Sequence, residues 1–134
     1  MSHLARSDFF PTGKWLPEAV RWISWGTHHL TRAGSVFYWE NLIRPLGLSG
    51  APEPSALEAA EADFHQYAPV LDDVLAGRAW LVDDRITYAD FRVATVLPFA
   101  AQAKLPIAGY LNILKWHDRL TECAAWRDPF DGLA

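Results

Sequence analysis

Apolar residues recur at helical spacing along most of the chain, and no window alternates in the manner of a β-strand. The pattern predicts one long first helix that begins near Pro17 and runs past Trp39 with a bend. A second, amphipathic helix is expected over 55–76, a third after the turn at 83–84, kinked or ended near Pro98 and Pro106, and a last one around 110–120. We therefore predict an all-α bundle of about five helices.

The first helix carries two apolar stripes. One contains Leu16, Val20, Ile23, Thr27 and Leu30, and the other, offset from it, contains Trp15, Trp22, Trp25 and His29. A helix with two apolar faces usually buries both, so something must cover the tryptophan-rich stripe, and we expect a partner surface to do so. Gly26 and Gly34 weaken the helix and indicate either a kink or close packing.

The second helix has its own boundary signals. Ser55 and Glu58 have the spacing of a capping box, and Gly77 fits the end of the helix. Pro69 is expected to kink it, because a proline removes one hydrogen bond from the ladder.

The third helix has the clearest start. Thr87 is a natural N-cap, and Asp90 lies three residues later, where its carboxylate can accept from the cap N–H. Ile86 and Phe91 are spaced as a hydrophobic staple around that box. These four residues predict the start of a helix buried in the centre of the bundle. Farther on, Trp126 and Phe130 are expected to fold back onto the last helix.

Composition narrows the class of protein. A chain of 134 residues, half of them hydrophobic, is long enough for one domain with a sizeable core. A net charge of −4 without a Lys/Arg run argues against nucleic acid or an acidic membrane as partner. The single cysteine, Cys123, rules out an intrachain disulfide. With no signal-peptide core or spanning segment at the start, we expect a cytoplasmic protein.

No catalytic residue, metal site or cofactor site is predicted. His28 and His29 are adjacent, so they point about 100° apart on a helix and form no ligand pair. The sequence contains neither the nucleophile turn of a hydrolase nor a glycine-rich phosphate loop.

The run from Trp80 to Phe91 resembles the "YLxGDxLTxADF" segment of glutathione S-transferases, which opens the central helix of their all-helical C-terminal domain. The similarity continues in register to a "LP…YPxIxxWxxR"-like ending, carried by Leu105, Pro106, Tyr110, Ile113, Trp116 and Arg119. Asp83 stands where the family usually has Gly, at a position that should need a left-handed turn, which Asp tolerates. Leu111 replaces the usual Pro.

The resemblance implies a division of the chain. Leu4-Ala5-Arg6 is similar to the end of a transferase's thioredoxin-like domain, so 1–14 would be a linker remnant and 15–134 the helical domain. A frayed N-terminus is the alternative interpretation of that segment. In the family, the residues that bind glutathione and activate its thiol precede this point. The chain alone is therefore expected to be inactive.

The stretch 22–32 is similar to the "WLNYxxxELHK" segment of bacterial beta-like transferases, whose polar residues face the cleft near glutathione and the second substrate. The resemblance makes cleft candidates of Ser24, Trp25, His28, His29, Thr31 and Arg32. Arg32 could meet a glutathione carboxylate, and Thr31 stands where the family has His. The alternative is that Trp25 only packs at an interface and that the polar residues only face solvent.

The resemblance implies the electrophile-binding and dimer-forming half of a detoxifying transferase, with glutathione as co-substrate. Its partners would be a thioredoxin-like domain, a second identical subunit, or both, and a small electrophilic substrate. A non-catalytic association module of the same fold is the alternative. A dehalogenase, isomerase or reductase relative also remains open.

Overall fold

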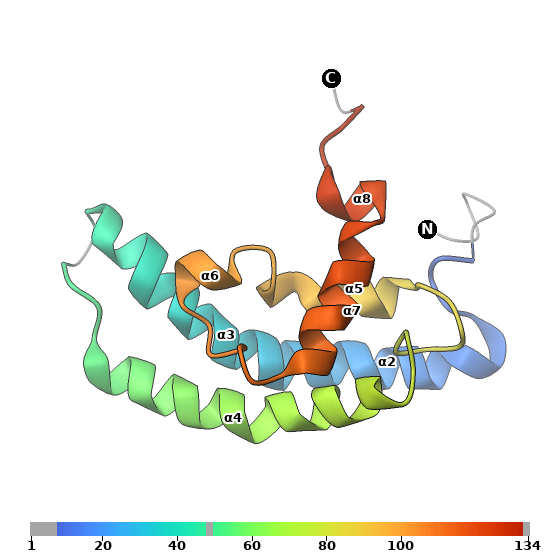
Figure 1. Ribbon diagram of the computed structural model, residues 1–134, viewed down its shortest axis with the longest axis horizontal. Coiled ribbons are helices and arrows are strands. Elements are labelled where there is room, and N and C mark those ends of the chain that lie inside the picture. Colours follow the sequence, from blue (N-terminus) through green and yellow to red (C-terminus); the bar gives the residue numbers. More distant parts are fainter. Residues whose placement is uncertain (1–7, 48–49, 133–134) are drawn as a thin grey trace.

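The computed structural model describes residues 8–47 and 50–132, and in these ranges the fold is all-α, as predicted. The helices are α2 (Leu16–Trp25), α3 (Thr31–Tyr38), α4 (Pro54–Ala76), α5 (Tyr88–Val93), α6 (Ala100–Ala103), α7 (Leu111–Thr121) and α8 (Ala124–Arg127). The segment that contains α2 and α3 forms one helical rod. Figure 1 shows the long α4 lying along this rod, with α5 and α6 above them and α7 standing across the bundle.

The predicted first helix is a continuous helical rod. Two π-helical turns, Gly26–Leu30 and Trp39–Ile43, lie on either side of α3, and a 3₁₀ turn, Arg44–Leu46, ends the rod. A kink or close packing was expected at Gly26 and Gly34, and the structure shows close packing. A Cβ on Gly34 would lie 2.9 Å from Cγ1 of Val96, and one on Gly26 would lie 3.0 Å from Cγ2 of Val93.

The core lies where the rod, α4, α5 and α7 meet. Trp116 of α7 and Phe64 of α4 are its largest fully buried side chains, and Leu30 and Val93 are buried beside them. These residues come from the predicted apolar stripes of four different helices. Burial of those stripes is what holds the short helices in place, since helices of this length are marginal on their own.

The start of α5 confirms the central prediction. Thr87 is the N-cap, and the Asp90 half of the capping box is formed, since Asp90 Oδ2 accepts from Thr87 N at 3.0 Å. The Thr87 hydroxyl makes no hydrogen bond within the described residues. Asp90 Oδ1 accepts from Leu81 N and from Trp116 Nε1, each at 3.0 Å. Burial raises the pKa of the Asp90 carboxyl, and the donated hydrogen bonds oppose that shift. One carboxylate therefore ties the preceding loop, the helix start and α7 together.

The residues around the box are partly as expected. Asp83 adopts the left-handed conformation, with φ at 59°. Phe91 packs edge-on against Phe9 and Trp126, with ring centroids 4.9 and 5.1 Å apart. Ile86 is half-buried beside the core, and its staple contact with Phe91 stays a prediction. The α-helical part ends at Val93 and is followed by a 3₁₀ turn, Ala94–Val96, so the helix stops before Pro98 as expected.

Three expectations were wrong. Ser55 and Glu58 form no capping box, because the N-cap of α4 is Glu53, two residues before Ser55, and the Ser55 hydroxyl donates to the Glu53 side chain at 3.1 Å. A proline at the first helical position supplies the fixed φ there and lacks only an N–H that would be unpaired. Phe130 does not fold back, since it is 81% exposed. Trp126 does fold back onto α7, where its indole N–H donates to His117 Nε2 at 3.3 Å.

The third error concerns the two stripes of the first helix. Trp22 is buried by the chain's own helices, and His29 stacks on Tyr67 of α4 with ring centroids 4.4 Å apart. In contrast, Leu16 and Val20 of the other stripe are 39% and 51% exposed. The face left uncovered by this chain is therefore the aliphatic one at the start of α2. Residues 1–7 of the predicted linker, including Leu4-Ala5-Arg6, lie outside the described residues.

Candidate functional site

An apolar groove lies between the rod and the short turn after α5. It has a volume of about 490 Å³ and is open to solvent. Its lining residues are Thr31, Ser35, Tyr38, Trp39, Ile43, Thr95 and Val96. Trp39 and Ile43 are 44% and 43% exposed, so two large apolar side chains stand at an open surface instead of in the core. Concave, mostly apolar surfaces with a few polar groups are the usual form of a small-molecule site.

The groove's position in the fold is set by two local features of the rod. The π-helical turns Gly26–Leu30 and Trp39–Ile43 enclose α3, so the groove-lining part of the rod has a changed helical pitch at both ends. Such turns are uncommon and occur frequently at functional sites. Gly34 lets the rod approach the opposite wall closely, since only a hydrogen atom fits against Val96. The groove is thus built from an irregular helix pressed against a short turn.

Tyr38 fastens the two walls together. Its hydroxyl donates to the backbone oxygen of Val96 at 2.6 Å and accepts from the N–H of Phe99 at 3.2 Å. Burial raises the pKa of Tyr38, while the bond from Phe99 opposes the shift. The phenol therefore stays protonated at neutral pH, with its proton committed to a backbone oxygen. Tyr38 can hold the groove's shape but is poorly placed to give a proton to a ligand.

Comparison with known proteins identifies the fold. The model of the glutathione S-transferase C-terminal domain family matches residues 31–123, which is more than half of the chain. The chain belongs to this family. No curated protein sequence matches it significantly.

Solved glutathione transferases have the same fold as this domain. Glutathione S-transferase III in its apo form is 22% identical with a TM-score of 0.81, over 94% of this chain and 59% of that one. A glutathione S-transferase from Rhodospirillum rubrum F11 is 19% identical with a TM-score of 0.80, over 97% and 60%. Ure2p5 from Phanerochaete chrysosporium, crystallised with 1-(S-glutathionyl)-2,4-dinitrobenzene, is 19% identical with a TM-score of 0.73, over 90% and 57%.

These matches cover only part of each solved transferase. The chain spans between half and three fifths of the length of the solved transferases with which it aligns. The groove lies within the region that the family model matches, because every lining residue falls between 31 and 96. The matched part of this transferase-like domain therefore includes its apolar groove.

The six cleft candidates have three different kinds of surroundings. Thr31 lines the groove. Ser24, His28 and Arg32 are exposed one turn apart, and His28 Nδ1 lies 2.8 Å from the backbone oxygen of Ser24 and 3.4 Å from its hydroxyl. Arg32 makes no ion pair within the described part of the chain.

Trp25 and His29 pack against other aromatic side chains of the chain. Trp25 packs edge-on against Trp22 at 5.4 Å between ring centroids, and His29 stacks on Tyr67. Both rings are therefore engaged in packing against the chain itself. Of the six candidates, Thr31 alone belongs to the groove, and the others stay predictions for a cleft that would need further structure.

Sequence reasoning missed most of the groove. The helical stripe through Thr31, Ser35, Tyr38 and Trp39 was visible as spacing of three and four residues, and could have extended the candidate list along the rod. Val96 and Thr95 carried no such signal. They come to the groove only because a 3₁₀ turn about sixty residues later packs against Gly34.

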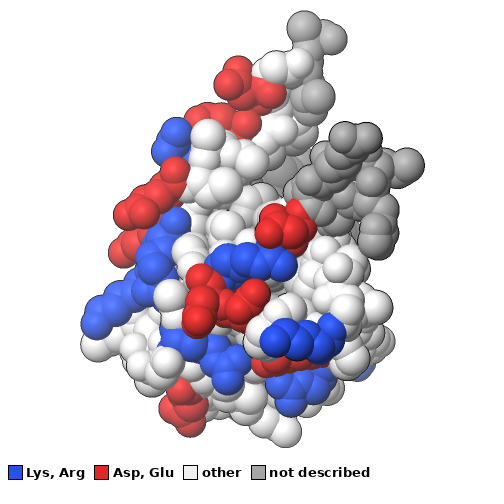
Figure 2. All heavy atoms as spheres, turned by 90° about the vertical axis from the view of Figure 1, so that its right-hand side faces the viewer, with Lys and Arg blue, Asp and Glu red and all other residues white. Residues whose placement is uncertain are grey.

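The other surfaces are weaker candidates for a functional site than the groove. In Figure 2, Lys and Arg side chains are interleaved with Asp and Glu on the face it shows, and ion pairs such as Arg78 with Glu18 (3.2 Å) follow that pattern. Among the described residues no group of three His, Cys, Asp or Glu could hold a metal ion. No described helix is long and apolar enough to cross a membrane.

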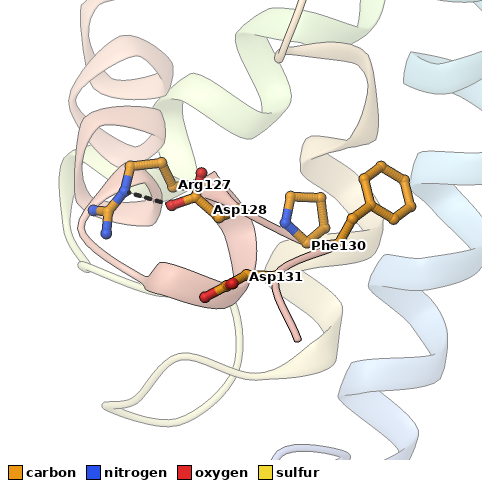
Figure 3. Close-up of a pocket in the computed structure, with 5 residues that line it drawn as sticks. Arg127, Asp128, Phe130 and Asp131 are labelled. Atoms are coloured by element: carbon orange, nitrogen blue, oxygen red, sulfur yellow. Dashed lines mark hydrogen bonds and ion pairs between the residues drawn. The ribbon is translucent and has the colours of Figure 1, made fainter. Parts of the chain in front are cut away.

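A larger hollow, of about 540 Å³, lies at the tail after α8. Figure 3 shows its lining residues following one another along a single stretch, with Arg127 paired to Asp128 at 3.2 Å. All five come from consecutive positions, 127–131, and Phe130 is exposed. Because no second element forms a wall, this hollow is a fold of the tail, and the groove remains the better candidate.

Proposed function

We propose that this chain is the electrophile-binding and dimer-forming half of a bacterial, beta-like glutathione transferase. The observation that carries the proposal is the apolar groove on the helical domain of this family. In the complete enzyme the thiolate of glutathione would attack an electrophilic carbon. The groove would hold that carbon in place, an effect of proximity and orientation.

The groove suits a small apolar ligand for physical reasons. Trp39 and Ile43 offer apolar surface that is now exposed to water, and covering such surface contributes about 25 cal/mol per Å². The ring of Trp39 could also stack on a flat ligand. A pocket of this kind retains apolar electrophiles and leaves very polar metabolites in solvent.

The chemistry would come from elsewhere in the enzyme. The groove's Tyr38 and Thr95 hydroxyls donate to backbone oxygens, so neither is placed to activate a thiol. The thiol-activating group and the glutathione site are therefore assigned to a thioredoxin-like domain, as the shorter span of this chain relative to whole transferases suggests. We expect the 134-residue chain to bind ligands without conjugating them.

The partner surface is proposed at the start of α2. Leu16 and Val20 expose apolar area on one helix face, and such area favours a thioredoxin-like domain or a second identical subunit as its cover. The same exposed face would serve a non-catalytic association module, the second candidate function. A cytoplasmic detoxifying enzyme is the setting that we propose for the first.

The groove can be tested by filling it. Ser35 is exposed and lines the groove, so Ser35→Trp should occupy its volume without disturbing the core. We expect nitrobenzene, an apolar ring with one acceptor group, to shift the amide NMR signals of 31–43 and 94–96 in the wild-type chain. Ser35→Trp should lose those shifts. Ala59→Trp, an equally large change at an exposed position of α4 outside the groove, should keep them.

Equal shifts in Ser35→Trp and in the wild type would show that the groove is not the binding site. Nitrobenzene would then bind elsewhere on the chain, with the exposed stripe of Ser24, His28 and Arg32 as the next place to look. No shifts in any of the three proteins would favour the association module instead.

A further inference from the structure

The polar groups of the groove differ in whether they have a partner. The Ser35 hydroxyl donates to the backbone oxygen of Thr31 at 2.6 Å, and the Thr95 hydroxyl donates to that of Arg92 at 3.0 Å. The Tyr38 hydroxyl bridges Val96 and Phe99. Three of the four hydroxyl groups that line the groove are therefore committed to the backbone.

Thr31 is the exception. Its Oγ1 is buried and has no hydrogen-bond partner within the described ranges. Three other atoms there share this state, Trp22 Nε1, Thr87 Oγ1 and Arg119 Nε, and none of their residues lines the groove. A buried hydroxyl without a partner costs free energy, so each such group calls for an explanation.

The helix geometry around Thr31 makes its state unusual. One turn earlier, the Thr27 hydroxyl donates to the backbone oxygen of Ile23 at 2.9 Å, which is the ordinary arrangement for a threonine inside a helix. Thr31 follows the π-helical turn Gly26–Leu30, and its backbone N–H bonds to Gly26 five residues back. The altered pitch comes directly before the residue whose hydroxyl is left unpaired.

We propose that Thr31 determines the ligand specificity of the groove by donating its hydroxyl to one acceptor oxygen of the ligand. The proposal rests on the proposed function, because it assumes that the groove binds an apolar ligand. A threonine in a helix has two accessible χ1 rotamers, so the side chain can turn its hydroxyl toward a ligand that offers an acceptor.

The number of unpaired polar groups in the groove indicates the chemical class of its ligand. One hydroxyl in an apolar groove suits a ligand with a single carbonyl-type or nitro-type oxygen on an otherwise apolar skeleton. A ligand without an acceptor leaves the Thr31 hydroxyl unpaired, and a ligand with several polar groups leaves its own groups unpaired. The site should therefore prefer the first kind over both others.

A pair of nearly isosteric probes tests this. 2-Acetylnaphthalene carries a carbonyl oxygen, and 2-isopropenylnaphthalene replaces that oxygen with a methylene group. We expect the 134-residue chain to bind the ketone about fivefold more tightly than the alkene, the ratio expected of one neutral hydrogen bond. Affinities are measured from the amide NMR shifts of 31–43.

Thr31→Val removes the hydroxyl and keeps the shape. It should bind the alkene with unchanged affinity and lose the fivefold preference for the ketone. Thr31→Ser, which restores a hydroxyl, should recover the preference. Thr27→Val is the matched control, the same change one turn away and outside the groove, and should leave both affinities unchanged. The thermal midpoint of Thr31→Val should equal or exceed that of the wild type, because a buried unpaired hydroxyl is removed.

Three results would overturn the proposal, and they can be distinguished. If both naphthalenes bind the wild type equally, or Thr31→Val weakens both by the same factor, Thr31 is a structural residue and the groove keeps its proposed function. If neither naphthalene shifts the groove signals, the proposed function fails as well. A midpoint of Thr31→Val well below that of the wild type would show a structural role for the hydroxyl.

Discussion

The surroundings of Asp90 and those of Thr31 show two opposite ways to treat a buried polar group. The Asp90 carboxylate is fully buried and accepts hydrogen bonds from Leu81, Thr87 and Trp116, which belong to a loop, a helix start and another helix. The Thr31 hydroxyl is also shielded from solvent but has no partner within the described residues.

The difference separates scaffold from site. A carboxylate with several donors fixes the relative positions of the segments that supply them, and disturbing it is costly. An unpaired hydroxyl beside an open groove, in a helix with π-helical turns, stabilises nothing in the free chain. Regions that bind ligands are commonly drawn from the less stable part of a structure. We therefore expect changes at Asp90 to act on folding and changes around Thr31 to act on binding.

The largest expected effect is at the scaffold. Asp90→Ala leaves three buried N–H donors without an acceptor, and should lower the free energy of unfolding by about 3 kcal/mol. Urea unfolding followed by circular dichroism measures it. Asp84→Ala, in the same loop but exposed, should change stability by less than about 0.5 kcal/mol. Similar losses in the two variants would mean that Asp90 does not anchor the fold.

The next effect links the scaffold to the groove. An added methyl group on Gly34 would meet Cγ1 of Val96 at 2.9 Å, and the stiff valine has little room to yield. Gly34→Ala should cost about 1 kcal/mol, because overpacking outweighs the gain in helix propensity. It should also weaken ligand binding, since Val96 lines the groove.

Gly77→Ala is the control for that change, because a methyl group there meets nothing within 4 Å. Its stability should equal or slightly exceed that of the wild type. A Gly34→Ala protein as stable as Gly77→Ala, with full ligand affinity, would show that the close approach of the rod to Val96 does not shape the groove.

The smallest effect concerns pH. Burial lowers the pKa of His117 below 6.5, and Asp118 partly opposes the shift. His117 Nε2 accepts from Trp126 Nε1 at 3.3 Å, which requires neutral imidazole. The unfolded chain therefore takes up this proton more readily, and stability should fall as the pH drops from 6.5 through the lower folded-state pKa.

His117→Gln removes the titration and keeps an acceptor. The difference in stability between pH 7.5 and pH 5.5, measured by urea unfolding, should be smaller in this variant than in the wild type. Subtracting the pH-dependent stability difference of the variant from that of the wild type cancels the contributions of the other histidines. Equal pH dependence in both proteins would mean that His117 is not held neutral by the fold.

The Asp90 half of the capping box was predictable because it is local. Thr87 and Asp90 lie within one helical turn, so their spacing alone indicates the hydrogen bond between them. The contact of Asp90 with Trp116 was not predictable in this way. Nor was the start of α7, where Asp72 of α4 accepts from Asn112 N and Ile113 N at 2.9 and 3.0 Å. Such bonds depend on how helices meet, which periodicity does not encode.

The groove was only partly predictable for the same reason. The resemblance of the first helix to transferases pointed to Thr31, and the structure places that residue in the groove. The opposite wall comes from Val96, which reads in the sequence as an ordinary buried residue. The expectation for the tryptophan stripe failed because Trp22 finds its cover on this chain, whereas Leu16 and Val20 do not. Apolar spacing shows which faces need covering, not what covers them.

The central claim, that this chain is the helical half of a glutathione transferase, is tested most directly by the intact mass of the endogenous protein purified from its source cells. The account predicts a species larger than 15.1 kDa by a thioredoxin-sized domain. A native mass of 15.1 kDa would contradict it, because the chain would then lack the domain that supplies the activated thiol. The association module would become the better account of the exposed face of α2.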